Sequence, residues 1–205
     1  MTSDSEGLVP GATHPFTLDP ETGTVSWTVD GFDALSEQGL LPGRHELLEG
    51  RIHAVVRDAR HDRFALGIER SLVVRFGRDR VRSAVPVLVS TCNLPEADLV
   101  VLGPADDRMP DAPWVRACDV GLVVAVADAT VPRDRTVKAG VYAAAGIPEY
   151  WLVDVVRATV TLHRVPRDGR YHRVGTVSSR ESFAPSEALD DPISLSAMLA
   201  ALDQG

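Results

Sequence analysis

The hydrophobic pattern is clearest in the second half of the chain, where the stretch VGLVVAVA at residues 120–127 is apolar at consecutive positions. A strand with one face in water alternates apolar and polar side chains, so this run predicts a central strand covered on both faces. The next segment, RDRTVKAGVYAAAG at 133–146, predicts a helix that ends at its glycine, with Pro148 just beyond it. EYWLVDV at 149–155 predicts another strand, so the local order is strand, helix, strand.

Earlier in the chain, polar caps and glycines divide the apolar positions into further elements. Thr28 can cap a short helix, and Asp58 can cap a longer helix that carries apolar residues at helical spacing until Gly77. Between these helices, residues 44–57 predict a hairpin, with Gly50 near the turn and alternating polar and apolar residues beyond it. Further strands are predicted at 80–90, 97–103, 158–165 and 171–178, and a closing helix is predicted at 193–202.

The order of these elements predicts an α/β protein of the α+β kind, in which one mixed β-sheet is flanked by helices. Residues 1–26 are rich in Gly, Pro, Ser, Thr and acidic residues and predict a loose N-terminal extension, with room for one short strand near TVSWTV. A single domain is expected over residues 27–205.

Composition narrows the class of protein. Of the 205 residues, 44% are hydrophobic and 24% are charged, as in ordinary globular proteins. No apolar run reaches the ~18 residues of a membrane span, and the polar, acidic start lacks the order of a signal peptide, so a cytoplasmic protein without membrane association is expected. Cys92 and Cys118 lack metal-site spacing and are expected to be free, buried thiols.

The formal net charge of -8 argues against a protein that coats nucleic acid, because phosphate contacts supply most non-specific affinity. It leaves room for a local basic groove that contacts DNA, although most of the arginines are expected to be solvated residues on strand and helix faces. The arginines cluster in three regions: Arg57, Arg60 and Arg63; Arg78, Arg80 and Arg82; and Arg164, Arg167, Arg170 and Arg173.

Three residues could carry chemistry. Glu46 lies on the first hairpin, Asp98 opens a strand after the proline of LPEAD, and Lys138 lies on the helix that follows the buried strand. Magnesium prefers oxygen ligands and keeps several waters, so one or two carboxylates suffice to bind it. A nearby lysine could hold a phosphate or orient a water. Taken singly, each residue is more often an ordinary strand, turn or surface residue.

The chain resembles the Uma2 family of the PD-(D/E)XK nuclease superfamily. The resemblance covers about residues 28–199 and is most specific in KAGVYAAAGIPEYWLVD, with support from HELLEGRI, RHDRFALGIERSL and PEADLVVL. It implies a restriction-endonuclease-like fold and a metal-dependent endonuclease that hydrolyses phosphodiester bonds of DNA with Mg²⁺ or Mn²⁺. A homodimer would suit an enzyme that cuts two strands.

The resemblance also implies roles for individual residues. Asp98 matches the strand aspartate that binds the metal, and Glu46 matches the assisting acid on the hairpin. Lys138 matches the lysine that helps to activate the attacking water. His61 matches a histidine at the start of the first long helix, where a solvated helix-end residue is an equal alternative.

One position departs from the family pattern. The second metal-binding glutamate of similar proteins aligns with Ala125, which has no side-chain oxygen. The hypothesis that follows is a degenerate site with weak or absent hydrolysis. Two alternatives stay open: a rearranged site in which Asp128 or Glu96 replaces the glutamate, with weaker claims for Asp134 and Asp119, and a non-catalytic module for interaction or self-association on the same fold.

Overall fold

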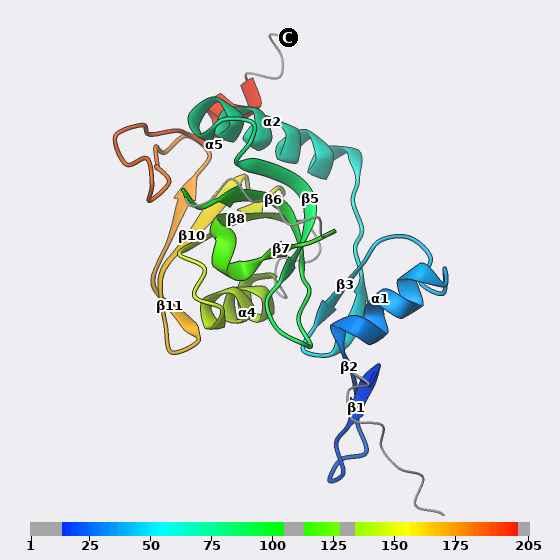
Figure 1. The fold of residues 1–205 in the computed structure, drawn as a ribbon. Coiled ribbons are helices and arrows are strands. Elements are labelled where there is room, and N and C mark those ends of the chain that lie inside the picture. Colours follow the sequence, from blue (N-terminus) through cyan, green and yellow to red (C-terminus); the bar gives the residue numbers. More distant parts are fainter. Residues whose placement is uncertain (1–13, 105–112, 128–133, 201–205) are drawn as a thin grey trace, which may run out of the picture.

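The computed structural model describes residues 14–104, 113–127 and 134–200 (Figure 1). Their centre is a seven-stranded sheet in the order β11-β10-β9-β8-β6-β5-β7. The pairs β8–β9 and β5–β7 are parallel and the other neighbours are antiparallel. The strands are β5 (Val81–Leu88), β6 (Glu96–Leu102), β7 (Val115–Arg116), β8 (Val120–Ala127), β9 (Glu149–Asp154), β10 (Thr159–Arg167) and β11 (Arg170–Ser178).

Helices cover both faces of this sheet, as Figure 1 shows. On one face lie α2 (Ala59–Phe76) and α5 (Leu195–Ala200), whose apolar side chains pack on Leu99, Val124 and Trp151. On the other face lies α4 (Ala139–Ala144), whose Tyr142 packs against the opposite side of β8 and β9. The mixed sheet between two helical layers confirms the predicted fold class.

A smaller group of elements precedes the sheet. It contains the hairpin of β1 (Phe16–Leu18) and β2 (Val25–Trp27), helix α1 (Val29–Glu37) and the hairpin of β3 (His45–Leu48) and β4 (Arg51–Ala54). Leu47 of β3 exchanges backbone hydrogen bonds with Leu94, which joins this group to the sheet just before β6 begins. Residues 16–27 therefore form a hairpin, which is more structure than the one short strand that the sequence suggested.

The caps expected from the sequence are present. Thr28 accepts a hydrogen bond from the Gly31 amide at the start of α1, and Asp58 accepts one from the His61 amide at the start of α2. Helix α2 ends at Gly77, whose φ of 83° is a conformation that favours glycine.

The strand–helix–strand unit of β8, α4 and β9 follows the hydrophobic pattern closely. Every residue of β8 is buried, as predicted for a strand covered on both faces. Before α4, residues Asp134–Lys138 form a π-helical turn (η2) where the sequence predicted regular helix. Such turns widen the backbone locally and are frequent at functional sites.

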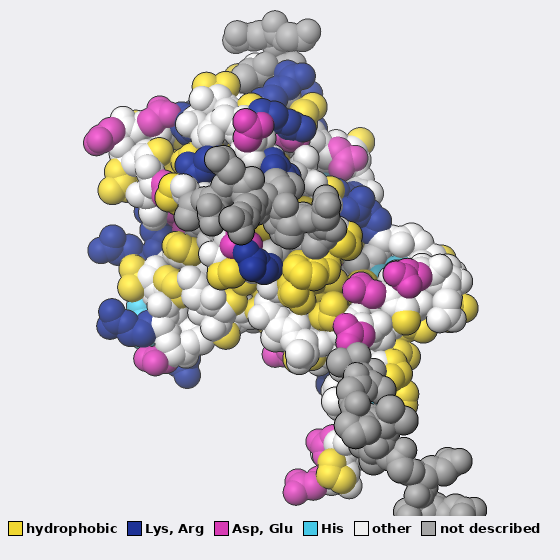
Figure 2. All heavy atoms as spheres, viewed as in Figure 1, with side chains coloured by type: hydrophobic (Ala, Val, Ile, Leu, Met, Phe, Trp, Pro, Cys, Tyr) yellow, Lys and Arg dark blue, Asp and Glu magenta, His cyan; other side chains and the backbone are white. Residues whose placement is uncertain are grey.

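Two surface features bear on the predictions of the sequence. Cys92 is half-buried and Cys118 is exposed, so the prediction of buried thiols is wrong, although both thiols are free. Figure 2 shows basic and acidic side chains interspersed over the visible face, with basic side chains at the edge formed by β10 and β11. No helix among the described residues is long and apolar enough to span a membrane.

Candidate active site

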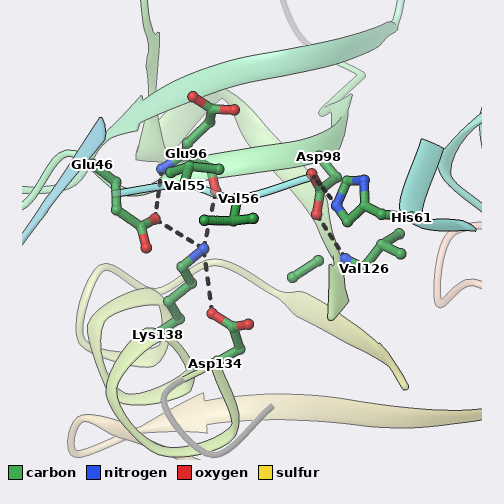
Figure 3. A pocket seen from close by; sticks show the side chains of 10 residues that line it. Glu46, Val55, Val56, His61, Glu96, Asp98, Val126, Asp134 and Lys138 are labelled. Carbon is green, nitrogen blue, oxygen red and sulfur yellow. Dashed lines mark hydrogen bonds and ion pairs between the residues drawn. The ribbon is translucent and has the colours of Figure 1, made fainter. Parts of the chain in front are cut away.

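A small cavity lies where β3, β6, β8 and the π-helical turn meet (Figure 3). Its volume of about 20 Å³ suffices for roughly one water molecule. The sequence candidates Glu46, Asp98 and Lys138 all line it, and Ala125 forms part of its wall. The structure therefore brings together residues that are up to 92 positions apart, from Glu46 to Lys138.

One side of the cavity is an ion cluster around the Lys138 ammonium. Its Nζ lies 2.9 Å from Glu46 Oε2 and 3.4 Å from Asp134 Oδ1, and it donates a hydrogen bond of 3.2 Å to the Glu96 carbonyl. Burial lowers the pKa of Lys138, but the charges of Asp134 and Glu46 outweigh burial and raise this pKa above its ordinary value. The two carboxylates therefore favour the charged form of Lys138, which lies between them.

The burial of this cluster corrects two ordinary interpretations of the sequence. Glu46 is 1% exposed and Lys138 is 7% exposed, so neither is a solvated strand or helix residue. The composition carried a signal for Lys138, because it is the only lysine in the chain, and the other 20 basic residues are arginines. A compact ammonium directs three donors from one nitrogen toward two acids and a carbonyl, whereas a guanidinium spreads its donors in a plane over three nitrogens.

The other side of the cavity is organised around the carboxylate of Asp98. Its Oδ2 accepts a hydrogen bond of 2.7 Å from the Val126 amide, on the neighbouring strand β8. Its Oδ1 lies 2.8 Å from Arg57 Nη2 and 3.1 Å from His61 Nε2. Both oxygens of Asp98 are thus engaged by groups of the protein.

These contacts shift the pKa values of the pair. Burial raises the pKa of Asp98, but the hydrogen bond and charge of His61, the Val126 amide and Arg57 outweigh it and bring this pKa below its usual value. Burial lowers the pKa of His61, but the hydrogen bond to Asp98 and its charge raise this pKa above the ordinary value. Each group therefore favours the charged form of the other.

Glu96, the first residue of β6, is paired with arginines. Its Oε1 accepts a hydrogen bond of 2.7 Å from Arg57 Nη2, and both of its oxygens accept from Arg44 Nε. Figure 3 shows its carboxylate directed away from Lys138. Sequence reasoning left Glu96 open as a replacement metal ligand; the structure pairs it with two arginines.

The site residues do not fit a divalent metal as they stand. Ala125 is 2% exposed, lies on the wall of the cavity and offers no oxygen. Both oxygens of Asp98 accept hydrogen bonds, and one oxygen of Glu46 contacts Lys138. Within residues 14–104, 113–127 and 134–200, no three His, Cys, Asp or Glu side chains form a group that could hold a metal. Asp128 lies outside the described residues.

His61 gives the stability of the protein a specific pH dependence. Because its pKa is raised in the folded state, its stabilising contribution is complete below the ordinary value of 6.5 and is lost as the pH rises through the folded pKa. His163 acts in the opposite sense, since burial lowers its pKa. We therefore expect His61→Asn to destabilise the protein more at about pH 6 than at about pH 9.

Urea denaturation of wild type and His61→Asn at both pH values measures this difference. His163 titrates in both proteins and cancels in the comparison. An equal difference at the two pH values would contradict the assignment of a raised pKa to His61.

Comparisons with known proteins add to this geometry. The sequence model of the Uma2 family, described as "Putative restriction endonuclease", matches residues 33–198. The fold is similar to a solved structure described as "a putative nuclease belonging to DUF820" from Anabaena variabilis, with a TM-score of 0.61 and 16% sequence identity. This similarity covers 82% of the present chain and 98% of the other. No curated protein matches the chain.

Proposed function

The chain belongs to the Uma2 family, and on that premise we propose that it is a nuclease-fold protein whose metal-dependent hydrolysis of DNA is weak or lost. Restriction-endonuclease-like families generally use divalent metal ions. In this chain Asp98 and Glu46, which would hold such an ion, instead contact basic side chains and backbone amides of the protein. The single observation that carries the proposal concerns Asp98. Both of its carboxylate oxygens accept hydrogen bonds from the protein, and Ala125, which lines the same cavity, offers no side-chain oxygen.

Electrostatics explains why this arrangement opposes a metal. A divalent ion binds where carboxylates are left with uncompensated negative charge, and it then lowers the pKa of its water. Here each acid already has at least one basic side chain within 3.4 Å. The four carboxylates are Glu46, Glu96, Asp98 and Asp134, and the groups that face them are Arg44, Arg57, His61 and Lys138.

A second candidate function is a non-catalytic binding module on the same fold. The observation in its favour is the edge hairpin of β10 and β11, where Arg167, Arg170 and Arg173 are exposed on a chain of net charge -8 (Figure 2). Arginines on an exposed strand can contact phosphates without a catalytic site. This candidate predicts retention of DNA that is not cut.

The test is a calorimetric titration with Mn²⁺, the stronger-binding mimic of Mg²⁺, on wild type and on Asp98→Ala. We expect no binding to the wild-type protein at millimolar metal, and no cleavage of duplex DNA that depends on Asp98. If the site were a functional metal site, the wild-type protein would bind Mn²⁺ and the Asp98→Ala variant would not.

The same samples separate the two candidates. DNA that is retarded in a gel at low salt and released as salt rises, with no cleavage, supports the binding module. Efficient metal-dependent cleavage that disappears in Asp98→Ala would overturn the proposal.

A further inference from the structure

A short segment, residues 55–58, crosses the cavity between β4 and α2 and is here named the strap. Val55 and Val56 line the cavity, and Val56 is 78% exposed. Figure 3 shows Val56 between Lys138 and Asp98, and Val55 beside Glu46 and Glu96. The strap is held at its first residue by a hydrogen bond of 2.9 Å from the Val55 amide to the Arg44 carbonyl. It ends at Asp58, the cap of α2.

Arg57 joins the strap to the central sheet. One of its nitrogens, Nη2, lies 2.7 Å from Glu96 Oε1 and 2.8 Å from Asp98 Oδ1, two carboxylates on the same strand. Its Nε is buried without a hydrogen-bond partner among the described residues. The side chain is therefore held through Nη2 between two acids, rather than by the two-pronged pairing that arginine usually makes with one carboxylate.

From this geometry we propose that Arg57 is the resident cation of the site: its guanidinium takes the place of a metal ion beside Asp98 and fastens the strap over the cavity. A positive group bridging two carboxylates supplies the charge that a metal would supply, so an ion has to displace it. The inference deepens the proposed function, because it names the group that keeps Asp98 from binding a metal.

Arg44 provides the comparison that isolates this role. Arg44 contacts the same Glu96, at 2.9 Å, but its other hydrogen bond goes to the Ala84 carbonyl and none goes to Asp98. Its side chain is 49% exposed, against 20% for Arg57. Removing Arg44 thus deletes one ion pair of Glu96 and leaves Asp98 and the strap in place.

The first experiment measures how often the strap opens. Because Lys138 is the only lysine and lines the cavity, an amine-reactive acetylating reagent reports access to the site through one peptide, with the α-amino group as internal reference. We expect Arg57→Gln to accelerate acetylation of Lys138 about tenfold or more over wild type, since charge-assisted hydrogen bonds hold the strap. Arg44→Gln is expected to leave the rate near that of wild type.

Equal rates in Arg57→Gln and Arg44→Gln would overturn the proposal. If Arg57→Gln does not fold, the wild-type protein supplies the answer by NMR. A guanidinium held between two carboxylates rotates slowly about its Nε–Cζ bond and gives separate Nη proton signals. A single averaged signal for Arg57 would show that it is not fastened and would overturn the proposal.

The second experiment tests displacement by a metal, and it rests on the proposed function. Calorimetry compares Mn²⁺ binding by two double variants. One combines Ala125→Glu with Arg57→Gln, and the other combines Ala125→Glu with Arg44→Gln. If a protein with Ala125→Glu does not fold, Ala125→Asp replaces it in both. We expect Mn²⁺ binding to be about tenfold tighter in the double variant with Arg57→Gln, because only there does Asp98 lose its guanidinium partner. Equal affinity of the two double variants for Mn²⁺ would overturn the role proposed for Arg57.

The two proposals fail separately. Metal binding and cleavage by the wild-type protein would refute the loss of hydrolysis. A wild-type protein without either property, in which Arg57→Gln behaves like Arg44→Gln, would refute only the role of Arg57.

Discussion

Lys138→Met is expected to lower the free energy of unfolding by about 3–5 kcal/mol, because it leaves two buried carboxylates without their cation. Glu46 and Asp134 are 1% and 2% exposed, and Lys138 Nζ lies between them. Removing one partner of a buried ion pair costs more than the pair contributes, since the remaining charge stays desolvated. Methionine keeps the length of the lysine stem, so the change tests charge rather than packing.

The control for this prediction removes the acids together with the cation. The triple variant Glu46→Gln, Asp134→Asn, Lys138→Met contains no uncompensated charge in the cluster and is expected to recover most of the lost stability. Urea denaturation at neutral pH measures all three proteins. A Lys138→Met protein as stable as wild type would show that the acids are protonated or solvated, against the geometry of the cluster.

The fold was predictable from the sequence where local patterns decide it. The continuous apolar run of β8 could be satisfied only by burial on both faces, and Gly77 and the caps at Thr28 and Asp58 marked helix ends through backbone chemistry alone. The membership of the chain in the Uma2 family was predicted from the longer motifs and is confirmed. Of the predicted site residues, Glu46, Asp98 and Lys138 lie around one cavity.

The network around these candidates could not be predicted, because its partners are far apart in sequence. Arg57 meets acids 39 and 41 positions away, and Arg44 meets one 52 positions away. No sequence periodicity indicates which arginine of a cluster forms buried ion pairs, so the sequence did not distinguish Arg57 from Arg60 and Arg63. Asp98 also accepts a hydrogen bond from the Val126 amide of β8, a contact that depends on how β6 and β8 lie beside each other in the folded sheet.

Asp98→Ala is expected to destabilise the protein by about 2–4 kcal/mol, because Asp98 is a member of a buried network. It leaves the His61 imidazole, one side of Arg57 and the Val126 amide without their acceptor. In a working metal site the outcome has the opposite sign. Carboxylates that gather to bind an ion repel one another in its absence, and replacing one of them commonly stabilises the protein. The sign of the change in unfolding free energy therefore shows whether Asp98 stabilises the fold or has the energetics of a metal ligand.

The matched control is Asp119→Ala, which removes an ion pair of the same length. Asp119 Oδ2 lies 2.8 Å from Arg116 Nε, but this pair is at the surface, so little change in stability is expected. Denaturation of both variants in urea, with a chelator present to exclude traces of metal, measures the comparison. A stabilised Asp98→Ala would mean that the Arg57 and His61 contacts do not offset the repulsion among the acids, and that the site keeps the energetics of a metal centre despite Ala125.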